Sequence, residues 1–176
     1  MILCKRFMTA ERFTPQFDEA QTARITATKE QLENRPPTYV DFLTHATAQS
    51  GFLTFSMDSH RWMQTVLALK DKNPDLFENV YFDKRDMRTL YSDQVMAFLG
   101  IMRQSDSFGS IEINGNHEYL MHPDTSQAIN NSRRKVLEPH QEAIEEMAQI
   151  IGENLGTNTL EENFGDYFRS QVNSEE

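Results

Sequence analysis

Residues 110–121 read S-I-E-I-N-G-N-H-E-Y-L-M, and they carry the sharpest local signal in the sequence. Polar and apolar residues alternate through its first four positions, as they do in a half-buried strand. Asn114 and Gly115 follow, and both residue types tolerate the positive φ angles that a tight hairpin turn requires. The pattern predicts an antiparallel β-hairpin at about residues 110–121. Because two strands alone are marginally stable in water, we expect this hairpin to pack against other elements.

The register of the hairpin depends on the length of its loop. A two-residue loop would place Ile111 opposite Glu118, which mixes polar and apolar side chains on one face. A three-residue loop over residues 114–116 would place Ile111 opposite Tyr119 and give one coherent apolar face. We therefore predict the three-residue, bulged loop.

Helices are predicted on both sides of the hairpin. Before it, apolar residues recur at the helical period over residues 92–104. After it, a helical segment spans residues 124–155, and Pro139 must interrupt it because the proline ring clashes with the preceding turn. Near the start of the chain, Thr14 as N-cap and Pro15 as the first helical residue predict another helix. The predicted elements elsewhere are helices at about residues 15–34, 38–50, 58–72 and 160–172, and a short strand at residues 52–55.

The composition fits an α-rich domain. The chain has 176 residues with only seven glycines and six prolines, which argues against a turn-rich all-β fold. This length is sufficient for one hydrophobic core. We predict an α+β, mostly α fold with six or seven helices and one small antiparallel hairpin, in a single globular domain over residues 1–172. Residues 173–176 are expected to form a frayed tail.

Cysteine usage and hydropathy indicate a cytoplasmic protein. Cys4 is the single cysteine, which excludes an internal disulfide framework and a multi-cysteine zinc site. No stretch approaches the roughly 20 apolar residues that a membrane helix needs, and the apolar run at the start is too short for a signal peptide. We therefore expect a cytoplasmic protein with no membrane partner. Met1 and Met8 are both candidates for the start of translation.

Negative charge is concentrated in the second part of the sequence. Residues 1–100 carry 12 Lys and Arg against 13 Asp and Glu, a net charge of −1, whereas residues 101–176 carry 5 against 14, a net charge of −9. A field of this sign repels a phosphate backbone, so direct binding to nucleic acid is not expected. Acidity of this size commonly serves solubility, and the alternative is recognition of a basic protein surface.

The segment after Pro139 is amphipathic, and each of its two faces suggests a site. An exposed acidic row is predicted to contact a basic protein partner, and it consists of Glu138, Glu142, Glu145, Glu146 and Glu153. The apolar stripe of the same segment suggests self-association as a homodimer, and it contains Ile144, Met147 and Ile151.

A metal site near the hairpin is considered and set aside. His117, Glu118, His122 and Asp124 fall within eight residues. On a strand the two histidines point to opposite faces, because they are separated by an odd number of residues. The sequence therefore predicts no metal and no cofactor.

Arg134 and His140 form a candidate catalytic pair, with R-x5-H spacing inside a helical segment. This spacing resembles the R-x4-6-H pattern of HEPN ribonucleases, a resemblance that covers seven residues. In that family the two residues bind phosphate and assist the attack of the 2′-hydroxyl, so the resemblance implies a ribonuclease. The alternative is that Arg133, Arg134 and Lys135 form a solvated basic face.

Two further patterns bear on function. The order of helix 92–104, hairpin and following helix is that of a winged-helix protein, although the predicted wing has no lysine or arginine. Asp58, Ser59 and His60 have the residue types of a catalytic triad, but neighbours at a helix start cannot adopt triad geometry, so we predict a helix cap there.

The sequence therefore predicts a non-catalytic, acidic protein that binds another protein, as an inhibitor, an antitoxin or a regulatory adaptor. The two alternatives are a HEPN-like ribonuclease that uses Arg134 and His140, and a winged-helix regulator that binds nucleic acid.

Overall fold

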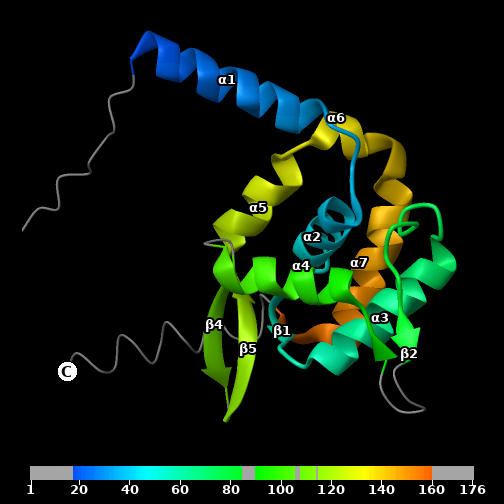
Figure 1. Cartoon of the computed structure of the whole chain (residues 1–176). Coiled ribbons are helices and arrows are strands. Elements are labelled where there is room, and N and C mark those ends of the chain that lie inside the picture. Colours follow the sequence, from blue (N-terminus) through cyan, green and yellow to red (C-terminus); the bar gives the residue numbers. More distant parts are fainter. Residues whose placement is uncertain (1–17, 85–89, 106–107, 114, 160–176) are drawn as a thin grey trace, which may run out of the picture. The chain divides into compact units, whose positions relative to one another are not determined.

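A computed structural model describes residues 18–84, 90–105, 108–113 and 115–159 of the chain (Figure 1). The chain divides into two compact units, Met1–Arg35 and Pro36–Glu176. In the first unit, α1 (Glu19–Asn34) begins with a capping box: Gln21 N–H donates to Asp18 Oδ1 at 2.7 Å, and Asp18 N–H donates to Gln21 Oε1 at 3.1 Å. The predicted start of this helix at Thr14 and Pro15 lies outside the described residues. The prediction of one domain over residues 1–172 stays a prediction.

The second unit confirms the predicted mostly α fold with a small antiparallel sheet. Its helices are α2 (Tyr39–Gln49), α3 (Ser59–Lys72), α4 (Asp93–Gln104), α5 (Pro123–Asn131), α6 (Arg134–Leu137), the 3₁₀ helix η1 (Glu138–His140) and α7 (Gln141–Leu155). Its strands are β1 (Phe52–Ser56), β2 (Asp83–Lys84), β3 (Leu90–Tyr91), β4 (Phe108–Ile113), β5 (Asn116–Met121) and β6 (Gly156–Thr159). The helix predicted at residues 160–172 lies outside the described residues.

The main sheet has the strand order β4-β5-β1-β6, and its pairs are antiparallel. β1 is the strand predicted at residues 52–55. The hairpin β4–β5 extends away from the helices in Figure 1. The sequence did not predict β6. At Gly156 the backbone is extended (φ −64°, ψ 137°) and leads straight from α7 into this strand, which pairs with β1.

The predicted register of the hairpin is wrong. Ile111 lies opposite Glu118 and Ile113 lies opposite Asn116, so the loop has two residues. The face of β5 that meets the core fixes this register: Tyr119 and Met121 are 0% and 1% exposed. Ile111 and Ile113 therefore lie on the other face and are half-buried.

The helical segment after the hairpin is broken twice, and the sequence predicted one of the breaks. As predicted, Pro139 interrupts the segment, and it lies in η1 between α6 and α7. The first break, at Ser132 and Arg133, was missed. Ser132 is extended (φ −75°, ψ 147°) and Arg133 is left-handed (φ 49°), a conformation that is rare for a residue with a side chain.

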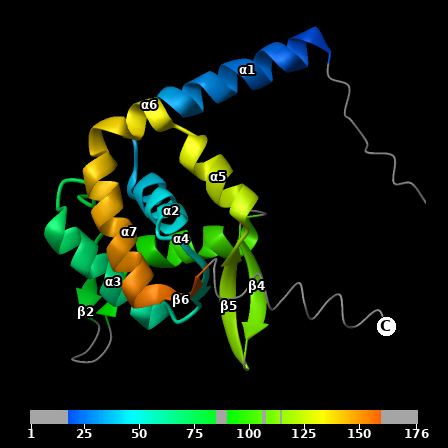
Figure 2. The same ribbon diagram turned by 180° about the vertical axis from the view of Figure 1, so that it is seen from behind.

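The core of the second unit lies between the sheet and helices α2, α3, α4 and α7. Figure 2 shows α7 running beside α2 and α3, and both helices contact it. Trp62 of α3 is fully buried, packs on Phe98 of α4 with ring centroids 5.6 Å apart, and donates its indole N–H to the Ser56 carbonyl at 2.7 Å. This side chain joins one strand and two helices. In the described part of the chain, no helix combines the length and the apolar character needed to cross a membrane.

Candidate functional site

The predicted acidic row is a surface of the folded chain, and we call it the acidic face. Its five carboxylates belong to exposed residues: Glu138 of η1 and Glu142, Glu145, Glu146 and Glu153 of α7. α7 contains no lysine or arginine, so the helix supplies no compensating cation of its own. Lys72 of α3 forms an ion pair with Glu146, with 2.6 Å between Nζ and Oε1. Among the described residues this is the one ion pair recorded on the acidic face.

Neutral side chains hold two of the other carboxylates in place. Gln141 donates its amide to Glu145, and Gln149 donates to Glu153, each at 2.9 Å. Both pairs are four residues apart on the helix, a spacing that brings side chains together. These contacts orient the carboxylates without neutralising their charge.

The apolar stripe of α7 lies on the opposite side of the helix and belongs to the core of this chain. Ile144, Met147 and Ile151 are each 0% exposed. The sequence correctly identified them as one apolar face, but this fold leaves no surface made of these side chains for a second copy.

Arg134 and His140 have different neighbours in the structure. Arg134 is exposed and lines a small cavity of about 160 Å³ together with His45, Gln49 and Glu138. The His140 ring instead meets the edge of Phe42, with ring centroids 5.2 Å apart. No hydrogen bond joins Arg134 to His140 in the part of the chain that the structure describes.

The residues considered for a metal site are dispersed. His117, His122 and Asp124 are exposed, whereas Glu118 is buried and accepts a hydrogen bond from the Thr157 hydroxyl. Within residues 18–84, 90–105, 108–113 and 115–159, no group of three or more His, Cys, Asp or Glu side chains is placed to hold a metal ion.

Asp58, Ser59 and His60 form the helix start that was predicted. Asp58 is the N-cap of α3, and its carboxylate accepts the His60 backbone N–H at 2.8 Å. This confirms the capping role.

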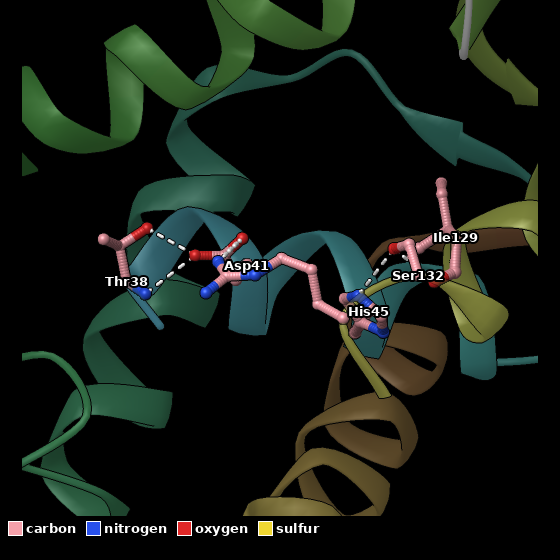
Figure 3. A network of polar contacts seen from close by, with 6 residues as sticks. Thr38, Asp41, His45, Ile129 and Ser132 are labelled. Carbon is pink, nitrogen blue, oxygen red and sulfur yellow. Dashed lines mark hydrogen bonds and ion pairs between the residues drawn. The ribbon is translucent and has the colours of Figure 1, made fainter. Parts of the chain in front are cut away.

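A buried polar network, which the sequence did not reveal, joins α2 to the link between α5 and α6 (Figure 3). At its centre Asp41 and Arg133 form an ion pair with 2.6 Å between Oδ1 and Nη1, and each side chain is only 10% exposed. Asp41 Oδ2 also accepts the backbone N–H and the hydroxyl of Thr38, at 2.8 and 2.9 Å. Ser132 Oγ lies 3.3 Å from His45 Nε2 on the next turn of α2. The Arg133 side chain is therefore largely buried, so the alternative of a solvated basic face is wrong for this residue; Arg134 and Lys135 are exposed.

The network shifts the pKa values of two of its members. Burial alone would raise the pKa of Asp41, but hydrogen bonds from Arg133 and Thr38 and the charge of Arg133 outweigh it and lower that pKa. Burial lowers the pKa of His45; Asp41 opposes this shift and Arg133 adds to it. Both groups are therefore held in the protonation states they have at neutral pH, a charged carboxylate and a neutral imidazole.

The network has the residue types of a nucleophile triad but not its hydrogen bonds. A triad serine donates its proton to the histidine, whereas the Ser132 hydroxyl donates to the Ile129 carbonyl at 2.7 Å. The Asp41 carboxylate is already occupied by Arg133 and Thr38, so it does not orient His45 as a base. The arrangement holds two segments of the chain together and does not activate a nucleophile.

Comparison of the chain with family models, with curated proteins and with solved structures finds no match.

Proposed function

We propose that this protein is a non-catalytic cytoplasmic binding protein, an inhibitor, antitoxin or regulatory adaptor, whose acidic face contacts a partner with a basic surface. The observation that carries the proposal is the distribution of charge on α7. Its exposed side bears four glutamates and no cation, and one of the four is neutralised by Lys72. Glu138 of η1, which directly precedes α7, is also exposed, and it lines a small cavity together with Arg134.

Charge of this kind acts collectively. An exposed ion pair contributes only about 0–1 kcal/mol, so no single glutamate would determine affinity. Several carboxylates on a rigid helix attract a basic partner and orient its approach, and salt weakens this attraction because the screening length is about 8 Å at physiological ionic strength. Binding through the acidic face should therefore weaken steadily as salt is added.

A matched pair of variants tests the proposal. The first changes Glu142, Glu145 and Glu153 to Gln, which keeps side-chain shape and leaves the Lys72–Glu146 pair intact. The control removes three other exposed carboxylates by Asp71→Asn, Asp75→Asn and Glu78→Gln, so both variants change the net charge equally. The full chain is immobilised, retained proteins from the native cell are identified by mass spectrometry, and the dissociation constant is then measured with the purified partner at several salt concentrations.

We expect one stoichiometric protein partner whose affinity falls about tenfold in the α7 variant and changes little in the control. Equal losses in both variants would assign the effect to net charge and remove the role of the acidic face. Retention of RNA, with cleavage that disappears in Arg134→Ala and in His140→Ala, would replace the proposal with the ribonuclease alternative.

A winged-helix regulator is the second candidate, and the strand order favours it. Apart from the short strands β2 and β3 between α3 and α4, the chain order α2, β1, α3, α4 and β4–β5 hairpin is that of a winged-helix protein, and β1 pairs with β5 as the first and last strands of that fold do. The charge of the hairpin, which would be the wing, does not favour DNA as the ligand. The described residues of β4 and β5 include no lysine or arginine, and β4 carries Glu112. Fluorescence anisotropy with labelled duplex DNA at physiological salt separates the candidates: saturable binding would support a DNA regulator over a protein-binding module.

A further inference from the structure

An uncharged cavity of about 280 Å³ lies where the end of α2, the start of β1 and the helix α5 meet. Two kinds of side chain line it. Apolar groups come from the sheet and carboxamides come from α5: Phe52, Leu53 and Met121, and Gln127, Asn130 and Asn131. No Asp, Glu, Lys, Arg or His lines this cavity. It shares only Asn130 with the smaller cavity beside Arg134, and it is separate from the acidic face.

The apolar side of the cavity is rigid. Leu53 and Met121 are 5% and 1% exposed and sit in adjacent strands. Phe52 is held against α7, since a Cβ atom added to Gly152 would lie 2.8 Å from its ring. These side chains cannot easily move to fill the space, because their own positions are fixed by close packing.

The polar side of the cavity has unused hydrogen-bonding capacity. Gln127, Asn130 and Asn131 are spaced i, i+3 and i+4, so they share one face of α5. The side-chain oxygen of Asn130 is buried, and no donor among the described residues reaches it. A buried acceptor without a donor is unfavourable, and a ligand N–H would satisfy it once the Asn130 amide rotates to open this oxygen to the cavity.

We propose that this cavity binds a small, planar, uncharged heterocycle that carries an amide-like donor–acceptor edge, the chemistry shared by nucleobases and nicotinamide. Carboxamide side chains pair with such an edge by two hydrogen bonds at once, and the apolar wall accepts the ring. A charged ligand is excluded because the cavity offers no opposite charge to offset its loss of hydration. The volume lies near the lower end of the roughly 300–1,000 Å³ range of ligand pockets, which suits a single ring system and not a whole nucleotide.

The proposal is tested by NMR titration of the full-length, ¹⁵N-labelled chain with uracil, nicotinamide and nicotinate. Nicotinate has the shape of nicotinamide but carries a carboxylate, so it isolates the role of charge. We expect saturable shifts of the Gln127, Asn130 and Asn131 side-chain amides with at least one neutral probe, and binding of nicotinate weaker by about tenfold or more.

Asn130→Leu keeps the branched shape and the number of side-chain heavy atoms but removes the amide, and it should weaken binding of the neutral probe about tenfold. Asn79→Leu changes an exposed asparagine outside the cavity and should have no effect. If Asn130→Leu does not fold, Gln127→Leu provides the same comparison at an exposed position. Absence of saturable binding by both neutral probes, equal binding of nicotinate, or unchanged affinity in a folded variant lacking one of these amides would each overturn the proposal.

Discussion

At the scale of single residues, the Asp41–Arg133 pair accounts for the most unusual backbone in the described chain. Arg133 is its one non-glycine residue with positive φ, at 49°. This left-handed conformation costs roughly 1–2 kcal/mol for a residue with a Cβ atom. The ion pair joins the break between α5 and α6 to the first turn of α2.

Asp41→Asn is therefore expected to destabilise the chain by about 3 kcal/mol, because it leaves the Arg133 guanidinium buried without its counter-charge. Urea unfolding followed by circular dichroism measures the difference. Asp71→Asn removes an exposed carboxylate and should stay within about 0.5 kcal/mol of the wild type. If the two variants were equally stable, the pair would not hold the fold together.

His45 makes the stability depend on pH in a predictable direction. Its pKa in the folded chain is below its ordinary value of 6.5, so the unfolded chain binds the proton more readily. Its contribution to stability is complete above pH 6.5 and is lost as the pH falls toward its folded pKa. Four charged groups lie around it, namely Asp41 and Arg133 in the network and Arg134 and Glu138 in the adjoining cavity. The lowered pKa of Asp41 adds a loss of the same sign at lower pH.

His45→Gln removes this titration and should flatten the fall in unfolding free energy between about pH 7.5 and pH 5.5. His60→Gln changes an exposed histidine and should leave the slope as in the wild type. Chemical unfolding at five or six pH values provides the slopes. A wild-type slope retained in His45→Gln would mean that another group is responsible.

At the scale of elements, the sequence predicted that the hairpin and the helix break exist, but it did not predict how the strands pair. Local alternation and the Asn114-Gly115 turn predict the hairpin, and Pro139 predicts a helix break, because each of these signals lies within a few residues. The register depends on which face of β5 meets the core, and that depends on β1, which pairs with β5, and on Thr157 of β6, which donates a hydrogen bond to the buried Glu118. The predicted register assumed that only apolar side chains would be buried on this hairpin. Glu118 is buried instead, and its hydrogen-bond partner Thr157 lies 39 residues away in a strand that the sequence did not predict.

Two helical glycines provide a test of how packing decides the sign of a substitution. At Gly100 of α4 an added Cβ meets nothing within 4 Å, so Gly100→Ala should stabilise the chain by about 0.5–1 kcal/mol through helix propensity. At Gly152 of α7 the same Cβ would lie 2.8 Å from the Phe52 ring, so Gly152→Ala should destabilise by about 1–3 kcal/mol. Thermal and urea unfolding measure both.

Phe52→Ala makes this comparison more specific. If the ring causes the cost, adding Gly152→Ala to the Phe52→Ala background should be neutral or stabilising, as it is at Gly100. A cost that persists without the ring would place the conflict elsewhere, for example with the Ser50 carbonyl, which would lie 3.5 Å from the added atom.

At the scale of the whole molecule, the parts of the site differ in how far the sequence could predict them. The acidic face follows from helical periodicity and charge within one segment, so its residues were predictable. The network could not be predicted, because Ser132 and His45 are 87 residues apart and only the packing of α5 on α2 brings them together. The same packing forms the cavity of carboxamides, whose residues have no distinctive spacing in the sequence.

The division of the chain at Arg35 leads to a prediction about its folding. The side chains that form the described core begin at Phe42 and end at Leu155, and the described side chains of α1 are exposed. A fragment of residues 36–176 should therefore unfold cooperatively, with a midpoint within about 2 °C of that of the full chain by calorimetry. A fragment that begins at Ser59 lacks α2, which packs on α5 and α7, and it should not fold. A fall of more than about 5 °C in the longer fragment would show that residues 1–35 contribute to the same cooperative unit, as the prediction of one domain over residues 1–172 requires.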